Sequence, residues 1–343
     1  MQAMKFPEPG RAEIVDVPIP VPKDNEVLVK VKAAGICASD VAAFTGKHDV
    51  RRPPVITGHE LAGEIVARGP AVTQRAAGER VAIEPHLGCG ACPYCRQGHY
   101  HECPSKRFMG VGDWIGAFAE YVVAAEPMCH VMPNDMSWEE GAALEPLCVG
   151  LHAVRRAGLQ AGERIAILGA GTIGLMTLLS LRCMAPGWIA VTDLSPSKLA
   201  LAARCGADVT IDARSADPIE AIRAATDGMG ADVVFLAVAA DAALRQSVEV
   251  CRRMGRLVVI ASFFHGGLLP VHPLAVRERV LIGTSMYTAD DYRLAIRLWQ
   301  RGQLAHLPQL LTERIPLARG PETVAALARG EKPDNVKTII EFV

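Results

Sequence analysis

The feature that most constrains the fold is an alternation of apolar runs and helical segments between residues 164 and about 283. Apolar runs at 164–168, 189–193, 208–211, 232–238 and 256–260 are separated by helical segments at 172–183, 195–205, about 218–225 and about 242–251. Runs that are apolar without a break indicate strands covered on both faces. Their alternation with helices predicts βαβ units and a parallel sheet.

A glycine motif joins the first of these strands to the first helix. Gly169-Ala-Gly171-Thr-Ile-Gly174 follows the run RIAIL and opens a helix. In a dinucleotide-binding loop the first glycine makes the turn, the second admits the pyrophosphate and the third lets helix and strand pack closely. The alternative, that these glycines only pack a helix on a sheet, stays open.

Asp193 supports the nucleotide interpretation. It ends the second strand, about 20 positions beyond Gly174, where a carboxylate accepts hydrogen bonds from both ribose hydroxyls. A carboxylate at this place would repel an additional 2′-phosphate. The prediction is therefore NAD rather than NADP.

The rest of the chain does not show this regular alternation of apolar runs and helical segments. Residues 1–136 are typical of short strands and loops, with clear alternation at 27–35. Ser137-Trp-Glu-Glu140 is a candidate capping box that predicts a helix running to about Arg156. A helix is expected at 289–301, and the segment 337–342 predicts a strand that returns to the first domain. The length of 343 residues suits two domains.

Four of the ten cysteines gather in one short segment, Cys89-x2-Cys92-x2-Cys95-x7-Cys103. Four thiolates so close together can surround one ion tetrahedrally, as in a structural zinc site with no open position. Such a site would hold a loop that has no core of its own. An iron–sulfur cluster, which also takes four cysteines, is an alternative.

Composition and charge exclude several classes of partner. The formal net charge is −1 and lysine and arginine do not cluster, so neither nucleic acid nor an anionic membrane surface is expected, and a nucleic-acid-binding zinc lobe is disfavoured. The uncharged stretch at 165–181 carries glycines near its start, which favours a strand–turn–helix over a membrane span. The first residues have no apolar export signal, so we expect a cytoplasmic protein.

Three further segments carry metal-ligand residue types: Cys37-Ala-Ser39-Asp40, Gly58-His59-Glu60 and Glu145-Pro146. Each alone also suits a buried thiol, a turn histidine or a helix-surface carboxylate. Taken in order with the four-cysteine segment, Gly-Ala-Phe118-Ala-Glu120-Tyr and GAGTIG, they resemble the medium-chain zinc alcohol dehydrogenase family over nearly the whole chain. The resemblance is strongest to the sorbitol and polyol dehydrogenase branch, with features of threonine 3-dehydrogenases.

The resemblance implies an α/β architecture of two domains. A GroES-like, β-rich catalytic domain would occupy residues 1–150 and be completed by about 286–343. A Rossmann domain with a doubly wound parallel sheet would occupy 151–285. The active site is expected in the cleft between them, and the assembly is expected to be a homodimer or homotetramer.

The resemblance also implies the residues of the site. A catalytic zinc would act as a Lewis acid on a small-molecule alcohol while hydride passes to NAD. Ser39 would take the substrate proton, and His86 would line the active site. The catalytic residues expected are Cys37, Ser39, His59, Glu60, Glu145 and His86, of which Cys37, His59 and Glu60, with Glu145 as ligand or near-ligand, would bind zinc. The NAD contacts expected are Gly169, Gly171, Thr172, Ile173, Gly174, Asp193, Lys198, Val238, Ile260, Ser262 and Ser285.

Two departures from the family's pattern bear on the substrate. Ala42 stands where relatives often carry the histidine that passes the proton to solvent, so the proton must leave through water, another group or His48. Met286 stands where sorbitol dehydrogenases carry an arginine, and methionine cannot donate to polyol oxygens. We expect a secondary alcohol of a polyol, sugar alcohol or cyclitol. The alternatives are an amino alcohol of the threonine type, a terpene alcohol, or a binding protein that keeps the fold without activity.

Overall fold

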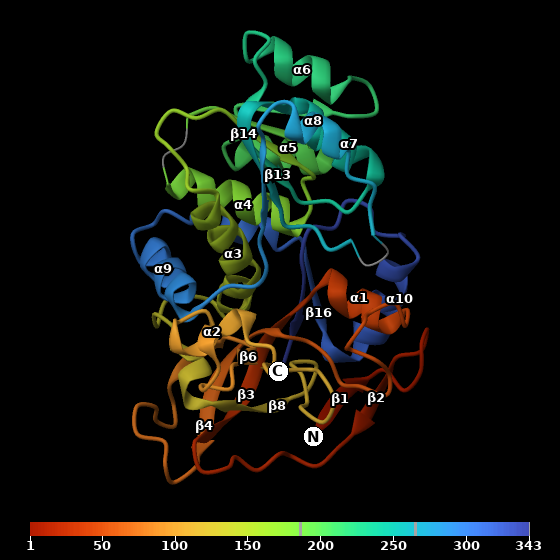
Figure 1. Ribbon diagram of the computed structural model, residues 1–343. Coiled ribbons are helices and arrows are strands. Elements are labelled where there is room, and N and C mark those ends of the chain that lie inside the picture. Colours follow the sequence, from red (N-terminus) through yellow and green to blue (C-terminus); the bar gives the residue numbers. More distant parts are fainter. Residues whose placement is uncertain (185–186, 264–265, 343) are drawn as a thin grey trace. The chain divides into compact units, whose positions relative to one another are not determined.

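The computed structural model describes residues 1–184, 187–263 and 266–342 (Figure 1). The chain divides into two compact units. One comprises Met1–Glu145, Thr288–Gln300 and Leu311–Val343, and the other comprises Pro146–Tyr287 and Arg301–Leu310. The helix α3 (Trp138–Ala157) contributes to both.

The second unit is built on a parallel sheet, as the alternating pattern predicts. Over the described residues the sheet has six strands in the order β12-β11-β10-β13-β14-β15. The order reverses between β10 and β13, and in such sheets ligands bind beyond the carboxyl ends of the strands at the point of reversal. The strands are β10 (Ile165–Leu168), β11 (Ile189–Asp193), β12 (Val209–Asp212), β13 (Ala231–Leu236), β14 (Cys251–Val259) and β15 (Val280–Gly283).

Helices surround this sheet in Figure 1. Local sequence explains where two of them begin, since Ser195 accepts a hydrogen bond from the Lys198 amide and Asp217 accepts one from Ile219. Apolar side chains of β10, β13 and α7 form the core. The helices are α4 (Thr172–Cys183), α5 (Pro196–Arg204), α6 (Pro218–Ala224), α7 (Asp241–Val250), α8 (Val271–Ala275) and η3 (Leu307–Leu310).

The first unit is rich in β structure. Within the described part of the chain its largest sheet has seven strands in the order β16-β17-β3-β4-β5-β9, with β8 also paired to β3. The predicted return of the tail is confirmed, because β17 pairs antiparallel with β3. The strands are β3 (Glu26–Ile36), β4 (Glu60–Arg68), β5 (Arg80–Ile83), β8 (Tyr121–Ala125), β9 (Cys129–Val131), β16 (Glu313–Pro316) and β17 (Thr338–Glu341).

Shorter elements complete the first unit around a core of buried apolar side chains. The predicted capping box is confirmed: the Ser137 amide donates to Glu140 Oε2 at 3.0 Å, and the Glu140 amide donates to Ser137 Oγ at 3.2 Å. The remaining elements are β1 (Gln2–Lys5), β2 (Glu13–Asp16), α1 (Ala38–Phe44), β6 (His86–Leu87), α2 (Pro93–Arg96), η1 (Tyr100–Glu102), β7 (Arg107–Phe108), η2 (Glu126–Met128), α9 (Ala289–Gln300), η4 (Leu317–Arg319) and α10 (Gly320–Ala328). Among the described residues, no helix combines the length and apolar character that crossing a membrane requires.

Candidate metal and nucleotide sites

Cys37, His59 and Glu60 come together in the first unit. Cys37 precedes α1, His59 directly precedes β4, and Glu60 is the first residue of β4. One possible ligand atom from each lies within 4.8 Å of the other two. Glu60 lies over Gly35 of β3, where an added Cβ would come within 1.8 Å of Glu60 Oε2. A thiol, an imidazole and a carboxylate are ligand types that zinc prefers, so this group fits a catalytic zinc with an open position.

Asp40 lies behind His59. Its Oδ1 is 3.5 Å from His59 Nδ1 and accepts a hydrogen bond from Thr57 Oγ1 at 2.7 Å, while its Oδ2 accepts from the Cys37 amide at 2.9 Å. Burial alone would raise the pKa of Asp40, but His59 and Arg51 hold it well below its usual range. An ionised carboxylate behind a metal-binding histidine fixes the orientation of the ring and leaves Nε2 for the metal.

Lys337 pairs with Glu60, an interaction that the sequence did not predict. Lys337 is 2% exposed, and its Nζ is 2.7 Å from both Glu60 oxygens and 3.0 Å from the Ile36 carbonyl oxygen. Burial lowers the pKa of Lys337, but the charges of Glu60, Cys37 and Glu145 raise it overall. Glu145, itself buried in α3, is therefore close enough to act on the same group of charges.

Ser39 contacts a second buried cation. Arg51 Nη1 donates to Ser39 Oγ at 2.8 Å and lies 3.5 Å from His48 Nε2. His48 Nδ1 accepts hydrogen bonds from the amides of Val50 and Arg51, so a neutral His48 carries its proton on Nε2. That tautomer leaves no lone pair on Nε2 to accept a proton, which disfavours the relay through His48 that the sequence left open.

His86 lies within a buried polar network. Its ring stacks on Phe108 with ring centroids 6.1 Å apart, and Phe108 also makes a T-shaped contact with His59, with centroids 5.6 Å apart. Glu84 lies 3.3 Å from His86 Nε2 and accepts from the Tyr100 hydroxyl at 2.6 Å. Burial, with Lys106 and His101, lowers the pKa of His86 to about 3, so the imidazole is neutral. The structure thus places His86 beside a ring that packs on a candidate zinc ligand, and its catalytic role stays a prediction.

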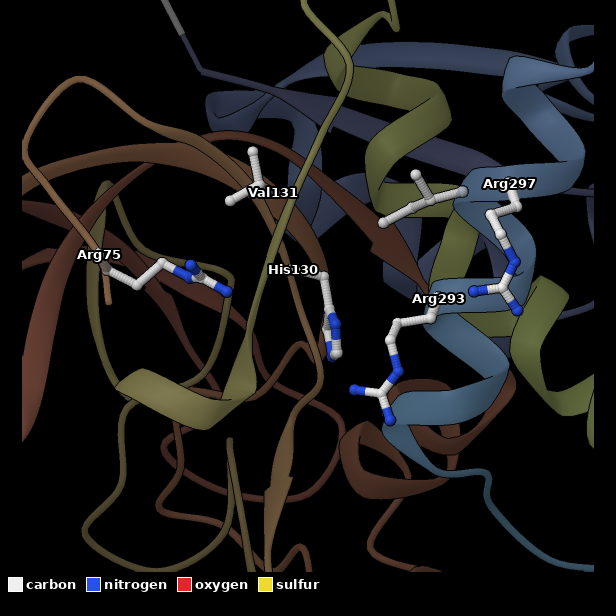
Figure 2. A pocket seen from close by; sticks show the side chains of 6 residues that line it. Arg75, His130, Val131, Arg293 and Arg297 are labelled. Carbon is white, nitrogen blue, oxygen red and sulfur yellow. The ribbon is translucent and has the colours of Figure 1, made fainter. Parts of the chain in front are cut away.

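The same network reaches a pocket rich in arginine. Figure 2 shows Arg75, Arg293 and Arg297 around His130. These residues line a pocket of about 290 Å³. His130 Nε2 is 3.0 Å from Glu84 Oε2, and a neighbouring cavity of about 540 Å³ is lined by both His86 and His130. No motif in the sequence indicated this pocket, because its residues come from separate segments.

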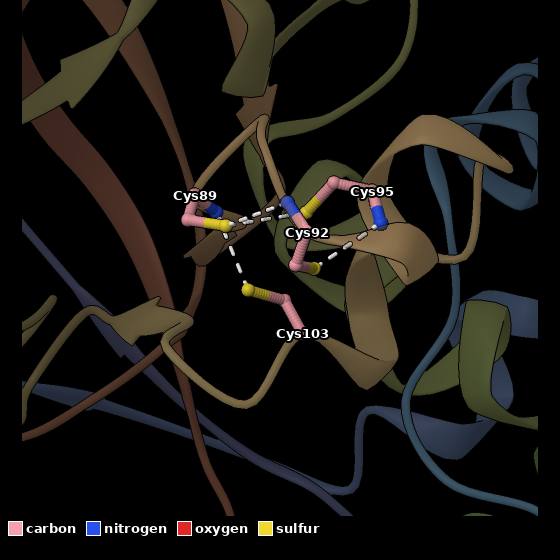
Figure 3. Close-up of side chains that lie close together, drawn as sticks. All are labelled: Cys89, Cys92, Cys95 and Cys103. Atoms are coloured by element: carbon pink, nitrogen blue, oxygen red, sulfur yellow. Dashed lines mark hydrogen bonds between the residues drawn. The ribbon is translucent and has the colours of Figure 1, made fainter.

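The four cysteines of the predicted structural site converge (Figure 3). One sulfur from each lies within 4.8 Å of the others, and the Cys89 and Cys95 sulfurs are 4.0 Å apart. Four sulfurs at zinc–sulfur distance in a tetrahedron would be about 3.8 Å apart, so the group fits one ion. Hydrogen bonds from the Ala91 and Cys92 amides lower the pKa of the Cys89 thiol to about 6, which favours the thiolate that binds metal.

The glycine loop has the shape that a pyrophosphate requires. Gly169 has a φ of +102°, which makes the turn. A Cβ on Gly174 would lie 1.8 Å from the Gly169 carbonyl oxygen, so only glycine permits the close packing of α4. A Cβ on Gly171, in contrast, would meet no atom within 4 Å. The space above Gly171, at the start of α4, is open to a ligand.

Asp193 lies at the end of β11, beside this loop. Its Oδ2 accepts from the Ala170 amide at 2.6 Å and its Oδ1 from the Ser195 amide at 2.8 Å. These bonds fix the carboxylate, which keeps further acceptor capacity for ribose hydroxyls. Lys198 lies in the first turn of α5, and Val238 packs against Gly169. Of the other expected contacts, Ile260 follows β14 and Ser262 and Ser285 are exposed.

A parallel sheet with a nucleotide-binding loop, a β-rich unit with a three-ligand group and a closed four-cysteine group define a dehydrogenase that uses zinc and NAD. Comparison with known proteins agrees. Residues 23–134 match the family described as alcohol dehydrogenase GroES-like domain, and residues 172–301 match zinc-binding dehydrogenase. The chain belongs to the zinc-dependent medium-chain alcohol dehydrogenase family and is an NAD-dependent alcohol dehydrogenase.

Individual relatives point to the polyol branch. The chain is 38% identical to sorbitol dehydrogenase of Bacillus subtilis over 76% of its length and 74% of that protein. It is 33% identical to L-threonine 3-dehydrogenase of Symbiobacterium thermophilum, over 96% and 95% of the two chains. The solved structure of galactitol-1-phosphate dehydrogenase from Escherichia coli superposes with a TM-score of 0.92 at 27% identity and covers 100% of both chains.

Proposed function

We propose that this enzyme oxidises the secondary alcohol of a polyol, sugar alcohol or cyclitol to a ketone, with NAD as hydride acceptor. The observation that carries the proposal is the group formed by Cys37, His59 and Glu60, with Ser39 two residues beyond the cysteine. The likeness to a sorbitol dehydrogenase and a galactitol-1-phosphate dehydrogenase supports the substrate class. An amino alcohol of the threonine type is the second candidate, favoured by the likeness to a threonine dehydrogenase.

The roles of the residues follow from their contacts. Zinc held by Cys37, His59 and Glu60, with Glu145 nearby, would supply a Lewis acid that lowers the pKa of the substrate hydroxyl. Ser39 Oγ accepts the substrate proton while its own hydroxyl proton passes to water, and the hydrogen bond from Arg51 fixes the position of that oxygen. Asp40 orients His59, and Lys337 orients Glu60. The closed group Cys89, Cys92, Cys95 and Cys103 holds its loop without taking part in the reaction.

A substrate panel combined with one substitution tests this proposal. D-sorbitol, myo-inositol, L-threonine and a cyclic terpene alcohol are scored for NADH formation, and we expect the polyols to be oxidised fastest. Cys37→Ala should abolish turnover yet keep NAD binding, measured by titration of tryptophan fluorescence. Zinc analysis should find two ions per chain, and one in Cys37→Ala.

Cys183→Ala is the matched control, because that thiol lies outside both cysteine-containing groups. It should keep both zinc ions and full activity. Turnover surviving in Cys37→Ala, or a single zinc in the unchanged protein, would contradict the assignment of the two sites. Loss of NAD binding in Cys37→Ala would mean that the substitution damages the fold.

The cofactor preference rests on Asp193. Its carboxylate is fixed beside the glycine loop, where the 2′-phosphate of NADP would meet a like charge. We expect kcat/KM to be higher with NAD than with NADP, and Asp193→Ser to narrow the difference. A higher kcat/KM with NADP in the unchanged enzyme would remove the role given to Asp193.

Location and assembly belong to the same proposal. Four thiolates bind zinc only while they stay reduced, which favours a cytoplasmic location. We also expect a homodimer or homotetramer, which sedimentation at several protein concentrations would distinguish from a monomer.

A further inference from the structure

Arg51 is a buried cation that has no anionic partner among the described residues. Arg51 is only 5% exposed, yet no carboxylate in the described part of the chain lies within 4.0 Å of its guanidinium. Its Nε, also buried, has no hydrogen-bond partner among the described residues. A buried charge is costly unless it is paired, because the protein must replace the water that it loses.

The contacts that Arg51 does make supply no full negative charge. Nη1 donates to the Ser39 hydroxyl, and the guanidinium carbon lies 4.6 Å from the centre of the Phe108 ring. Asp40 acts on Arg51 only from beyond ion-pair distance, and the oxygens of that carboxylate already accept from Cys37, Thr57 and Gly58. Among the described residues, no negatively charged group therefore pairs directly with the Arg51 guanidinium.

Arg51 also lies beside the groups proposed to act on the substrate. Ser39, its hydrogen-bond partner, is the proposed proton acceptor. Phe108, on which its guanidinium packs, makes a T-shaped contact with His59, with ring centroids 5.6 Å apart. An anion that pairs with Arg51 would thus lie near the reacting hydroxyl.

We propose that the substrate carries an anionic group, either a phosphate ester or a carboxylate, and that this group pairs with Arg51. The proposal rests on the proposed oxidation of a secondary alcohol and narrows its substrate class. A guanidinium is suited to this role because its planar set of donors matches the oxygens of a carboxylate or phosphate.

Three compounds with related six-carbon skeletons test the proposal: D-sorbitol, D-sorbitol 6-phosphate and D-gluconate. The measured quantity is the ratio of kcat/KM for each anionic compound to that for D-sorbitol. We expect a ratio above one for the phosphate ester or the carboxylate, and the better of the two identifies the anion. Arg51→Gln should lower that ratio about 10- to 100-fold, the usual size of a hydrogen bond to a charged group. Arg51→Lys keeps the charge but not the planar set of donors, so its ratio should lie between those of the unchanged enzyme and Arg51→Gln.

Arg52→Gln is the matched control, because Arg52 is the exposed neighbour and its side chain donates only to the Asp49 carbonyl oxygen among the described residues. It should leave the ratio unchanged. A preference for D-sorbitol in the unchanged enzyme, or the same ratio in Arg51→Gln, would overturn the proposal.

A binding measurement separates this proposal from the proposed function. D-gluconate or D-sorbitol 6-phosphate should raise the Tm of the zinc-loaded enzyme without NAD, and Arg51→Gln should lose that shift. If none of the three compounds is oxidised but the shift is present, the oxidation of polyols is wrong and the anion site stands. If neither anion shifts the Tm, the anion site is wrong. A fall in the ligand-free Tm of Arg51→Gln by several degrees relative to Arg52→Gln would assign Arg51 a structural role instead.

Discussion

At the scale of single residues, buried charges hold the candidate zinc ligands in place. Asp40 lies behind His59, and Lys337 binds both oxygens of Glu60. A divalent metal together with Lys337 would balance the three negative charges of Cys37, Glu60 and Glu145. Lys337 therefore allows two carboxylates and a thiolate to share one buried region, where charges without partners are costly.

Removing Lys337 should expose that cost. Lys337→Met leaves the carboxylate of Glu60 buried without its partner, and we expect the free energy of unfolding to fall by about 3–5 kcal/mol. The matched control is Lys332→Met, which breaks the partly exposed pair with Glu313 and should cost about 1 kcal/mol or less. Urea unfolding of the zinc-loaded proteins measures both. Equal losses in the two variants would show that the Glu60 pair contributes no more than a surface pair.

His86 gives the stability a dependence on pH. Its pKa is lowered to about 3 in the folded chain, against 6.5 as the ordinary value, so between these values the unfolded chain binds the extra proton. Stability from this group is therefore complete above about pH 6.5 and falls by about 1.4 kcal/mol per pH unit on acidification. His86→Gln should lose less stability between pH 6.5 and pH 4.5 than the unchanged protein does.

The control for this pH experiment is His306→Gln, at an exposed position. It should follow the unchanged protein through the same pH range in urea unfolding. If His86→Gln follows it too, His86 takes up its proton as readily in the folded state as in the unfolded state.

At the scale of elements, different glycines of the glycine loop serve the packing of the fold and the proposed binding of NAD. The space around Gly171 is open and that around Gly174 is filled, although both glycines belong to one motif. In the four-cysteine segment folding and binding would coincide, since the short helix α2 buries no residue and a bound metal would hold the segment together.

The two glycines should therefore respond differently to the same change. Gly171→Ala should keep the Tm within about 2 °C but weaken NAD binding, because the new methyl group enters the space proposed for the pyrophosphate. Gly174→Ala should lower the Tm, because its Cβ would overlap the Gly169 carbonyl oxygen. Calorimetry measures the Tm and the NAD affinity of each variant. Unchanged NAD affinity in Gly171→Ala would argue against a pyrophosphate at this loop.

At the scale of the whole molecule, the sequence predicted the helices and strands well but did not predict most of the contacts between buried charged side chains. The observed boundaries of α4 and β11 agree with the predicted ones to the residue. These boundaries depend on nearby glycines and on continuous apolar runs, both of which can be seen in the local sequence. The three-ligand and four-cysteine groups were predicted as sets because each residue type and its spacing carry chemistry. The clustering is now seen, and the metal each group binds stays a prediction.

The sequence did not predict the buried contacts of Arg51, of Lys337 or of the network around Glu84. Each depends on residues brought together from distant segments, as when Lys337 meets Glu60 across 277 positions of chain. A lysine directly before the apolar strand 338–341 was the one available signal. Arg51 had none, since its neighbour Arg52 is the same residue type and is exposed.

The place of β17 in its sheet has a consequence for biosynthesis. This strand lies between β16 and β3, and the residue before it, Lys337, holds Glu60. While the ribosome is still translating the second unit, β8 can already pair with Glu26–Lys30 of β3, but the end of β3 from Ala33 to Ile36 lacks β17 and Glu60 lacks Lys337. The surroundings of Glu60 in the nascent polypeptide thus stay incomplete until about residue 341 has been synthesised and β17 has joined β3.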